Sequence, residues 1–112
     1  MLNVRIYNKK DGNIYYNFEF IQDNKEITVK IPNTSQLLKK DEFELMASSN
    51  LYDINGKEIY EGDIMYINIY GSLKLGEVVF KKGNFILKYK DFESLLSFVK
   101  EREILGNIYE KK

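Results

Sequence analysis

The chain has 112 residues, of which 44% are apolar and 14% aromatic, enough for the core of one compact domain without a stapling metal or disulfide. Its 17 basic and 17 acidic residues balance, so no net charge draws it toward nucleic acid or an anionic membrane. It has no cysteine and no histidine, which excludes disulfides, thiol nucleophiles, imidazole bases and nearly all zinc or haem sites. We therefore expect no cofactor and no metal.

The first half of the chain alternates apolar and polar residues, which predicts half-buried antiparallel strands. Asp11–Gly12 and Asp23–Asn24 are turn-forming pairs, and each predicts a hairpin. The strands expected in this half cover residues 2–7, 14–21, 27–31 and 43–48.

Pro32 ends the third of these strands, because proline cannot donate a hydrogen bond to a sheet. Thr34 or Ser35 can then cap a short helix over residues 36–40. We interpret residues 1–50 as an N-terminal antiparallel β-meander.

Short strands separated by glycine dominate the second half. Asn55–Gly56 is a candidate type I′ turn, and Gly71–Ser72 and Lys82–Gly83 predict further hairpins. The apolar residues of 95–99 have helical spacing, and Asp91 or Ser94 can cap a short helix there. The strands expected in this half cover residues 63–70, 77–81, 85–90 and 103–109.

Short strands of this kind, with one helical turn before the last, are typical of a small barrel that is closed or partly closed. The predicted fold is therefore mainly β, with one or two short helices. Residues 51–112 are expected to form an SH3-like barrel, to which the meander of residues 1–50 is appended.

Two stretches of the second half carry a family resemblance: NGKEIYEGD (Asn55 to Asp63) and GNIYE (Gly106 to Glu110). Together they resemble the signature of the YopX family of phage and prophage proteins, and LYDI, GEVVF and SLLSF follow the same pattern in the same order. The first half is less similar, since it has Arg5 and Tyr7 but no tryptophan. The resemblance implies a phage-encoded protein with an SH3-like barrel, and it brings no established biochemical function.

The acidic residues of the signature allow two interpretations. Gly62 and Asp63 suit a rigid turn that enters the barrel, since glycine permits unusual backbone angles and aspartate accepts bonds from turn amides. Alternatively, Glu58, Glu61 and Asp63 converge to bind Mg²⁺ or to act as acid and base. We favour the turn, because the sequence places no nucleophile and no further catalytic group beside these carboxylates.

Nine tyrosines are many for this length, and tyrosine at a surface marks protein contact sites. We predict a non-enzymatic phage accessory protein that forms a homo-oligomer and binds another phage or host protein. The residues expected to bind a partner are Tyr60, Glu61, Asp63, Asn107 and Tyr109.

The span from residue 74 to residue 90 carries five lysines against one glutamate. Exposed on one hairpin, these lysines could follow a phosphate backbone, which makes a nucleic-acid-binding barrel the alternative function. Alternation places Phe85, Leu87 and Tyr89 in the core, however, which favours a solvated hairpin. The lysines are Lys74, Lys81, Lys82, Lys88 and Lys90.

No stretch approaches the roughly eighteen apolar residues of a membrane span, and the N-terminus lacks the apolar segment of a signal peptide. We expect no membrane partner and a place in the cytoplasm of a bacterial host cell.

Overall fold

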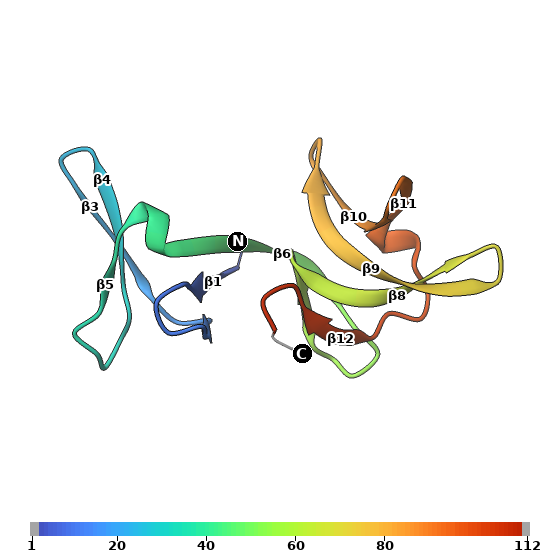
Figure 1. Cartoon of the computed structure of the whole chain (residues 1–112), viewed down its shortest axis with the longest axis horizontal. Coiled ribbons are helices and arrows are strands. Elements are labelled where there is room, and N and C mark those ends of the chain that lie inside the picture. The colour runs from blue at the N-terminus through green and yellow to red at the C-terminus, as the bar shows by residue number, and fades with distance from the viewer. Residues whose placement is uncertain (1–2, 111–112) are drawn as a thin grey trace. The chain divides into compact units, whose positions relative to one another are not determined.

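The computed structural model describes residues 3–110, and their contacts group into two compact units. The N-terminal unit comprises residues 4–46, and the C-terminal unit comprises residues 47–110 together with Asn3. The described residues form strands and 3₁₀ turns and contain no α-helix, so the prediction of a mainly β protein is confirmed (Figure 1). The division into domains at residues 50 and 51 stays a prediction.

The N-terminal unit is built from short antiparallel strands. β1 pairs with β2, and β3, β4 and β5 form a second sheet in that order, so both predicted hairpins are present. Its core consists of Ile6, Val29, Ile31, Leu38 and Phe43. The elements are β1 (Val4–Asn8), β2 (Ile14–Tyr15), β3 (Glu19–Asp23), β4 (Glu26–Lys30), β5 (Leu37–Leu38), η1 (Lys40–Glu42) and the first part of β6 (Phe43–Tyr52).

Two predicted elements of this unit were wrong. The strand expected over residues 14–21 is divided into β2 and β3, because Phe18 leaves the ladder and packs against the core. The helix expected over residues 36–40 is replaced by β5 and η1, because Leu38 pairs with Val29 and is fully buried. Leu2, at the start of the first predicted strand, lies outside the described residues.

The C-terminal unit contains a five-stranded antiparallel sheet in the order β11-β10-β9-β8-β12, curled into half a barrel (Figure 1). Four residues of the sheet, Met65, Ile67, Val78 and Leu87, form one core cluster with Ile59 and Leu96. The narrower prediction of an SH3-like barrel stays a prediction. The elements are the second part of β6, β7 (Glu58–Tyr60), β8 (Asp63–Ile69), β9 (Ser72–Lys81), β10 (Asn84–Tyr89), β11 (Phe92–Leu95), η2 (Leu96–Phe98) and β12 (Ile104–Asn107).

Turn chemistry explains these hairpins. Tyr70–Gly71 and Lys82–Gly83 both have two successive positive φ angles, the condition for a type I′ turn. The first of these turns lies one residue before the predicted pair. At Asn55–Gly56 only Gly56 has a positive φ, so the predicted type I′ turn was wrong. The chain instead makes a wider loop over residues 53–57, in which the amide of Asp53 donates to the carbonyl of Lys57.

The helix expected over residues 95–99 is a single 3₁₀ turn, η2. Leu95 belongs to β11, where it pairs with Ile86, and only Leu96 of the turn is buried. The amide of Val99 and the guanidinium of Arg102 both donate to the carbonyl of Leu96. One turn is therefore enough to bury Leu96 and to satisfy its backbone.

Close packing on the concave face explains Gly76 of the GEVVF segment. A β-carbon at this position would lie 3.0 Å from Cγ and Cδ1 of Leu87 and 3.3 Å from Cγ2 of Ile67. Both neighbours belong to the core, so they have little room to move.

The carboxylate of Asp53 ties the loop of residues 53–57 to the start of β12. Oδ1 accepts the amides of Asn55 and Lys57, both at 2.9 Å, and Oδ2 accepts the amide of Ile104 at 3.1 Å. The amide of Ile54 adds a bond of 2.7 Å to the carbonyl of Arg102. We call this set of bonds the Asp53 clamp.

The electrostatics of the clamp favour the charged carboxylate. Burial is the largest single influence on the pKa of Asp53 and raises it. The amides of Ile104, Lys57 and Asn55 together outweigh burial and hold the pKa below its ordinary value. Because the folded pKa is the lower one, the clamp stabilises the fold above the unfolded pKa and loses this contribution as the pH falls through the folded pKa.

Replacing Asp53 by Asn keeps the side-chain shape but turns an amide donor toward backbone donors. We expect Asp53→Asn to lower the free energy of unfolding by about 1–3 kcal/mol near neutral pH. The difference from the unmodified protein should shrink at acid pH, where Asp53 is protonated. Urea unfolding across this pH range measures the difference, with Asp23→Asn at the exposed end of β3 as the control. A difference in stability that does not change with pH would contradict the role of the clamp.

Adding one methyl group at Gly76 should overpack the concave core. We expect Gly76→Ala to destabilise the chain by about 1–3 kcal/mol. Thermal unfolding measures the change, and Lys74→Ala, at an exposed position on the same face of β9, should have little effect. Equal stability of the two variants would contradict this prediction, because it would show that the core rearranges to accept the added methyl group.

Candidate functional site

The EGD part of the signature forms the junction between β7 and β8. The buried carboxylate of Asp63 accepts the amide of Tyr60 at 2.8 Å, and Gly62 has a φ of 88°. Gly62 also donates to the carbonyl of Val78 and accepts the amide of Ile108, at 2.8 and 2.9 Å. The motif therefore ties β7, β9 and the end of β12 to one turn, as the structural interpretation predicts.

The other two carboxylates of the signature have separate partners. Glu58 accepts the hydroxyl of Ser48, and Glu61 accepts the amide of Ala47 at 3.1 Å. Within residues 3–110, no three His, Cys, Asp or Glu side chains come close enough together to hold a metal ion. The structure therefore does not bring Glu58, Glu61 and Asp63 together as one cluster.

The remaining signature residues lie at the same junction. Asn107 pairs with Asp63 across β12 and β8, and its Oδ1 accepts the amide of Tyr109 at 2.9 Å. Its Nδ2 donates to Glu110 at 3.3 Å. The five residues predicted to bind a partner therefore surround one junction, with Tyr60 and Asp63 buried. Their role in binding stays a prediction.

Carboxylates accompany the central lysines of the predicted basic hairpin. Lys88 lies between Glu77 of β9 and Glu93 of β11 in the ladder, and Lys81 donates to Glu93 at 2.8 Å. The hydrogen bond from Lys81, aided by the charges of Lys81, Lys88 and Lys82, holds the pKa of Glu93 below its ordinary value. This part of the sheet surface alternates in charge.

The outer lysines of the hairpin are dispersed. Lys82 and Lys90 lie in the turns at opposite ends of β10. Lys90 rests over the ring of Tyr89, with Nζ 5.4 Å from the centroid. Lys74 and Lys81 are an odd number of residues apart on β9 and so face opposite sides of the sheet. The five lysines do not form one continuous patch.

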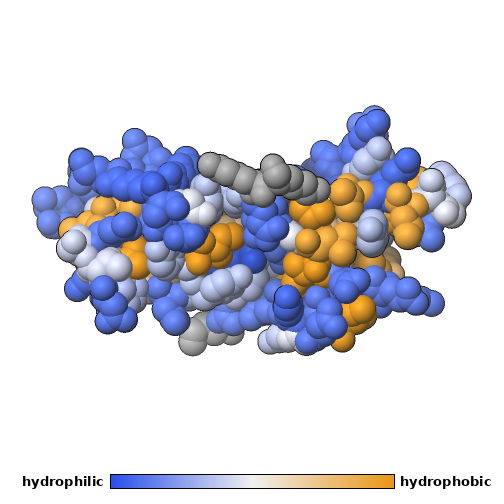
Figure 2. All heavy atoms as spheres, turned by 60° about the horizontal axis from the view of Figure 1, so that its bottom comes forward, coloured by the Kyte–Doolittle hydropathy of each residue, from blue (hydrophilic) through white to orange (hydrophobic). Residues whose placement is uncertain are grey.

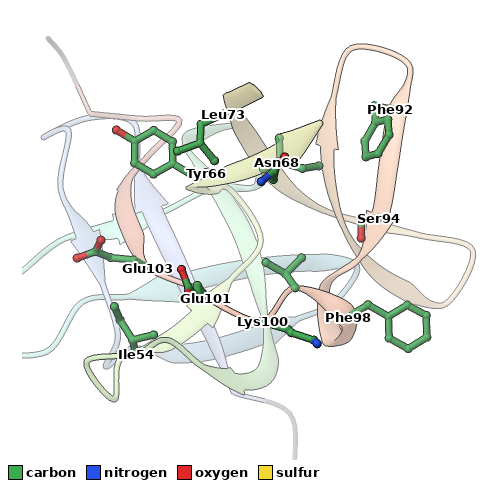
Figure 3. Close-up of a pocket in the computed structure, with 12 residues that line it drawn as sticks. Ile54, Tyr66, Asn68, Leu73, Phe92, Ser94, Phe98, Lys100, Glu101 and Glu103 are labelled. Carbon is green, nitrogen blue, oxygen red and sulfur yellow. The ribbon is translucent and has the colours of Figure 1, made fainter. Parts of the chain in front are cut away.

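A groove of about 580 Å³ opens in the C-terminal unit, between β8 and the segment that leads from η2 to β12 (Figure 3). Tyr66, Asn68 and Leu73 line one side. The facing side carries Ile54 and the charged residues Lys100, Glu101 and Glu103, and Phe92 and Phe98 lie at one end.

Much of the apolar lining is accessible to solvent. Phe98 is 73% exposed, Ile54 64% and Leu73 59%. Apolar side chains reach the surface within both units (Figure 2). In the C-terminal unit, the groove brings several of them together in one concave place.

One wall of the groove is an open strand edge. β12 pairs with β8 only over Asp63–Met65, whereas β9 pairs with β8 as far as Ile69. The residues just before β12 do not continue along β8. They lie beside the loop of residues 53–57, where the Asp53 clamp holds them. Within the part of the chain that the structure describes, residues 66–69 of β8 therefore have a strand on one side only.

Sequence reasoning did not find this groove. Tyrosine was the residue type predicted to contact a partner, and this prediction includes Tyr66. Phe98 was missed, because the helix expected over residues 95–99 assigned it to the core. The available signal was the run Lys100 to Glu103, whose charges directly follow an apolar segment.

None of the helical segments among the described residues is long and apolar enough to cross a membrane.

Comparisons with known proteins place the fold. The chain resembles two crystal structures: protein EF1440 from Enterococcus faecalis, with 20% identity and a TM-score of 0.59, and protein yopX from Bacillus subtilis, with 22% identity and a TM-score of 0.63. The first match covers 97% of this chain and 94% of the other, and the second covers 96% and 90%. No curated protein sequence matches the chain. The family model described as YopX protein matches residues 3–112, nearly the whole length, and the chain therefore belongs to the YopX family.

Proposed function

We propose that this chain is a non-enzymatic phage or prophage accessory protein that binds another protein, of phage or host, through the groove beside β8. The observation that carries the proposal is the concave gathering of exposed apolar side chains, with Phe98 73% exposed. Burying such side chains against a partner is the main favourable contribution to protein association. The cytoplasm of a bacterial host cell is the place that we propose for this binding.

The chemistry around the groove supports binding over catalysis. The signature carboxylates accept hydrogen bonds from backbone or hydroxyl groups and are not directed as a pair at a common point. The groove itself falls within the range of about 300–1,000 Å³ that is typical of ligand sites, and apolar walls dominate it. It is suited to recognition by shape and hydrophobic contact.

Nucleic acid is the less favoured partner. Affinity for a phosphate backbone depends on several lysines or arginines that face the same strand. Here Glu77 and Glu93 flank Lys88, and Lys81 is in an ion pair. The rings of Phe85 and Tyr89 pack against the core, so they offer no stacking platform.

A second candidate function is self-association of the N-terminal unit. Every residue of β3 is exposed, and β3 is the edge of its sheet among the described residues. Phe20 and Ile27 share a face with buried Val29, yet are 50% and 48% exposed. The apolar face of the sheet therefore extends beyond its own core, which favours a second copy of the chain as the cover.

The groove should select peptides by its apolar wall. We expect a random peptide library to yield ligands for the full-length chain, and Leu73→Asp or Phe98→Asp to weaken their binding by about tenfold or more. Phe80→Asp, at an exposed aromatic position outside the groove, is the matched control. A library that yields no ligand, or ligands indifferent to both groove variants, would overturn the proposed function.

Self-association should depend on the uncovered end of the β3–β4 hairpin. Light scattering of the unmodified chain is expected to show a homo-oligomer, and the double variant Phe20→Asp, Ile27→Asp should give monomers. Thr28→Asp places the same charge on the other face of β4 and should leave the oligomer intact. A monomer at all concentrations of the unmodified chain would refute this function.

A further inference from the structure

We propose that the groove takes an extended segment of its protein partner as an added β-strand along residues 66–69 of β8, and that it prefers a segment rich in lysine or arginine. This inference rests on the proposed function and names the form and the charge of the partner.

The backbone of β8 supplies the first part of the case. In an antiparallel strand, successive residues direct their N–H and C=O groups to opposite sides. Along residues 66–69 the bonds to β9 use one set, and no described strand meets the other set. Such an edge is a template for an extended peptide, whose main chain supplies the missing hydrogen bonds.

The Asp53 clamp explains why this edge is open. If β12 extended backward from Ile104, Glu103 would come to lie beside Tyr66 and close the edge. Instead, the amide of Ile104 donates to Asp53 and the carbonyl of Arg102 accepts the amide of Ile54. These bonds hold the chain on the far side of the groove, where Glu101 and Glu103 face Tyr66 and Asn68 across it (Figure 3).

The charged wall supplies the preference for basic residues. Glu101 and Glu103 line the groove, and neither is in an ion pair with any other residue between Asn3 and Glu110. Arg102, which lies between them, is directed away to the carbonyl of Leu96. Lys100 leaves the lining with one net negative charge. A basic segment complements this wall, whereas an acidic one is repelled.

Apolar contacts complete the recognition. Alternate side chains of an added strand point to the two faces of the sheet. On one face they meet Tyr66 and Leu73, and on the other they approach Phe92 and Val99. A segment that alternates basic and apolar residues therefore satisfies both the charge and the walls of the groove.

Three kinds of labelled synthetic peptide test the proposal with the full-length chain: alternating lysine and valine, alternating glutamate and valine, and the lysine peptide with N-methyl groups on either all lysine or all valine amides. We expect the lysine peptide to bind at least about tenfold more tightly than the glutamate peptide, as measured by fluorescence anisotropy. Methylation of one of the two amide sets should abolish binding, because it removes the donors that face β8. Amide hydrogen exchange within residues 66–69 should slow when the lysine peptide is bound.

Variants locate the charge effect. Glu101→Gln combined with Glu103→Gln should weaken the lysine peptide by about fivefold or more and reduce its salt dependence, whereas Glu26→Gln in the N-terminal unit should not. Retained binding of both methylated peptides would overturn strand addition, and a preference for the glutamate peptide would overturn the charge. Library ligands that bind the groove while no lysine peptide does would refute this inference and leave the proposed function standing.

Discussion

The contact of one carboxylate with three backbone amides governs the architecture of the C-terminal unit. Asp53 receives the amides of Asn55, Lys57 and Ile104, so a single buried charge organises a loop and the start of β12. Charge-assisted hydrogen bonds are roughly twice as strong as neutral ones, and three of them outweigh the cost of burying the carboxylate. Together with the bond from the amide of Ile54 to the carbonyl of Arg102, this contact holds the residues before β12 beside the loop of residues 53–57. The open edge of the groove is therefore a consequence of the clamp.

The motifs through which the sequence resembles the YopX family have a related role at the other end of β12. Gly62 and Asp63 form a turn that bonds to β9 and to the residue after β12, and Asn107 meets Asp63 across the ladder. These motif residues thus hold the entry and the exit of the half-barrel. The fold is similar to those of EF1440 and yopX although the identities are only 20% and 22%.

The distribution of charge favours a protein over a nucleic acid as the partner. Lysines of the β9–β10 hairpin alternate with glutamates on the same surface, and this pairing lowers the field that a phosphate backbone would meet. The groove differs from this hairpin in two respects. Its acidic residues have no ion-pair partners among residues 3–110, and several of its apolar side chains are exposed. A surface of this kind stabilises a complex mainly by desolvating apolar groups, with charge selecting among candidates.

Local pattern by itself determined the strands and most of their turns. Period-two alternation and turn pairs such as Lys82–Gly83 depend only on neighbouring residues, because the face of a strand and the sign of φ are local properties. The mainly β fold followed from them, whereas the family followed from the motifs NGKEIYEGD and GNIYE. The two predicted helices failed because Leu38 and Leu95 pair with the preceding strands, opposite Val29 and Ile86, and strand pairing overrides a short helical spacing. Local pattern could not predict the groove either, because it depends on the contact between Asp53 and Ile104, which are 51 residues apart. Only the folded chain brings that carboxylate to that amide, and the clamp to which this contact belongs leaves residues 66–69 of β8 unpaired on one side.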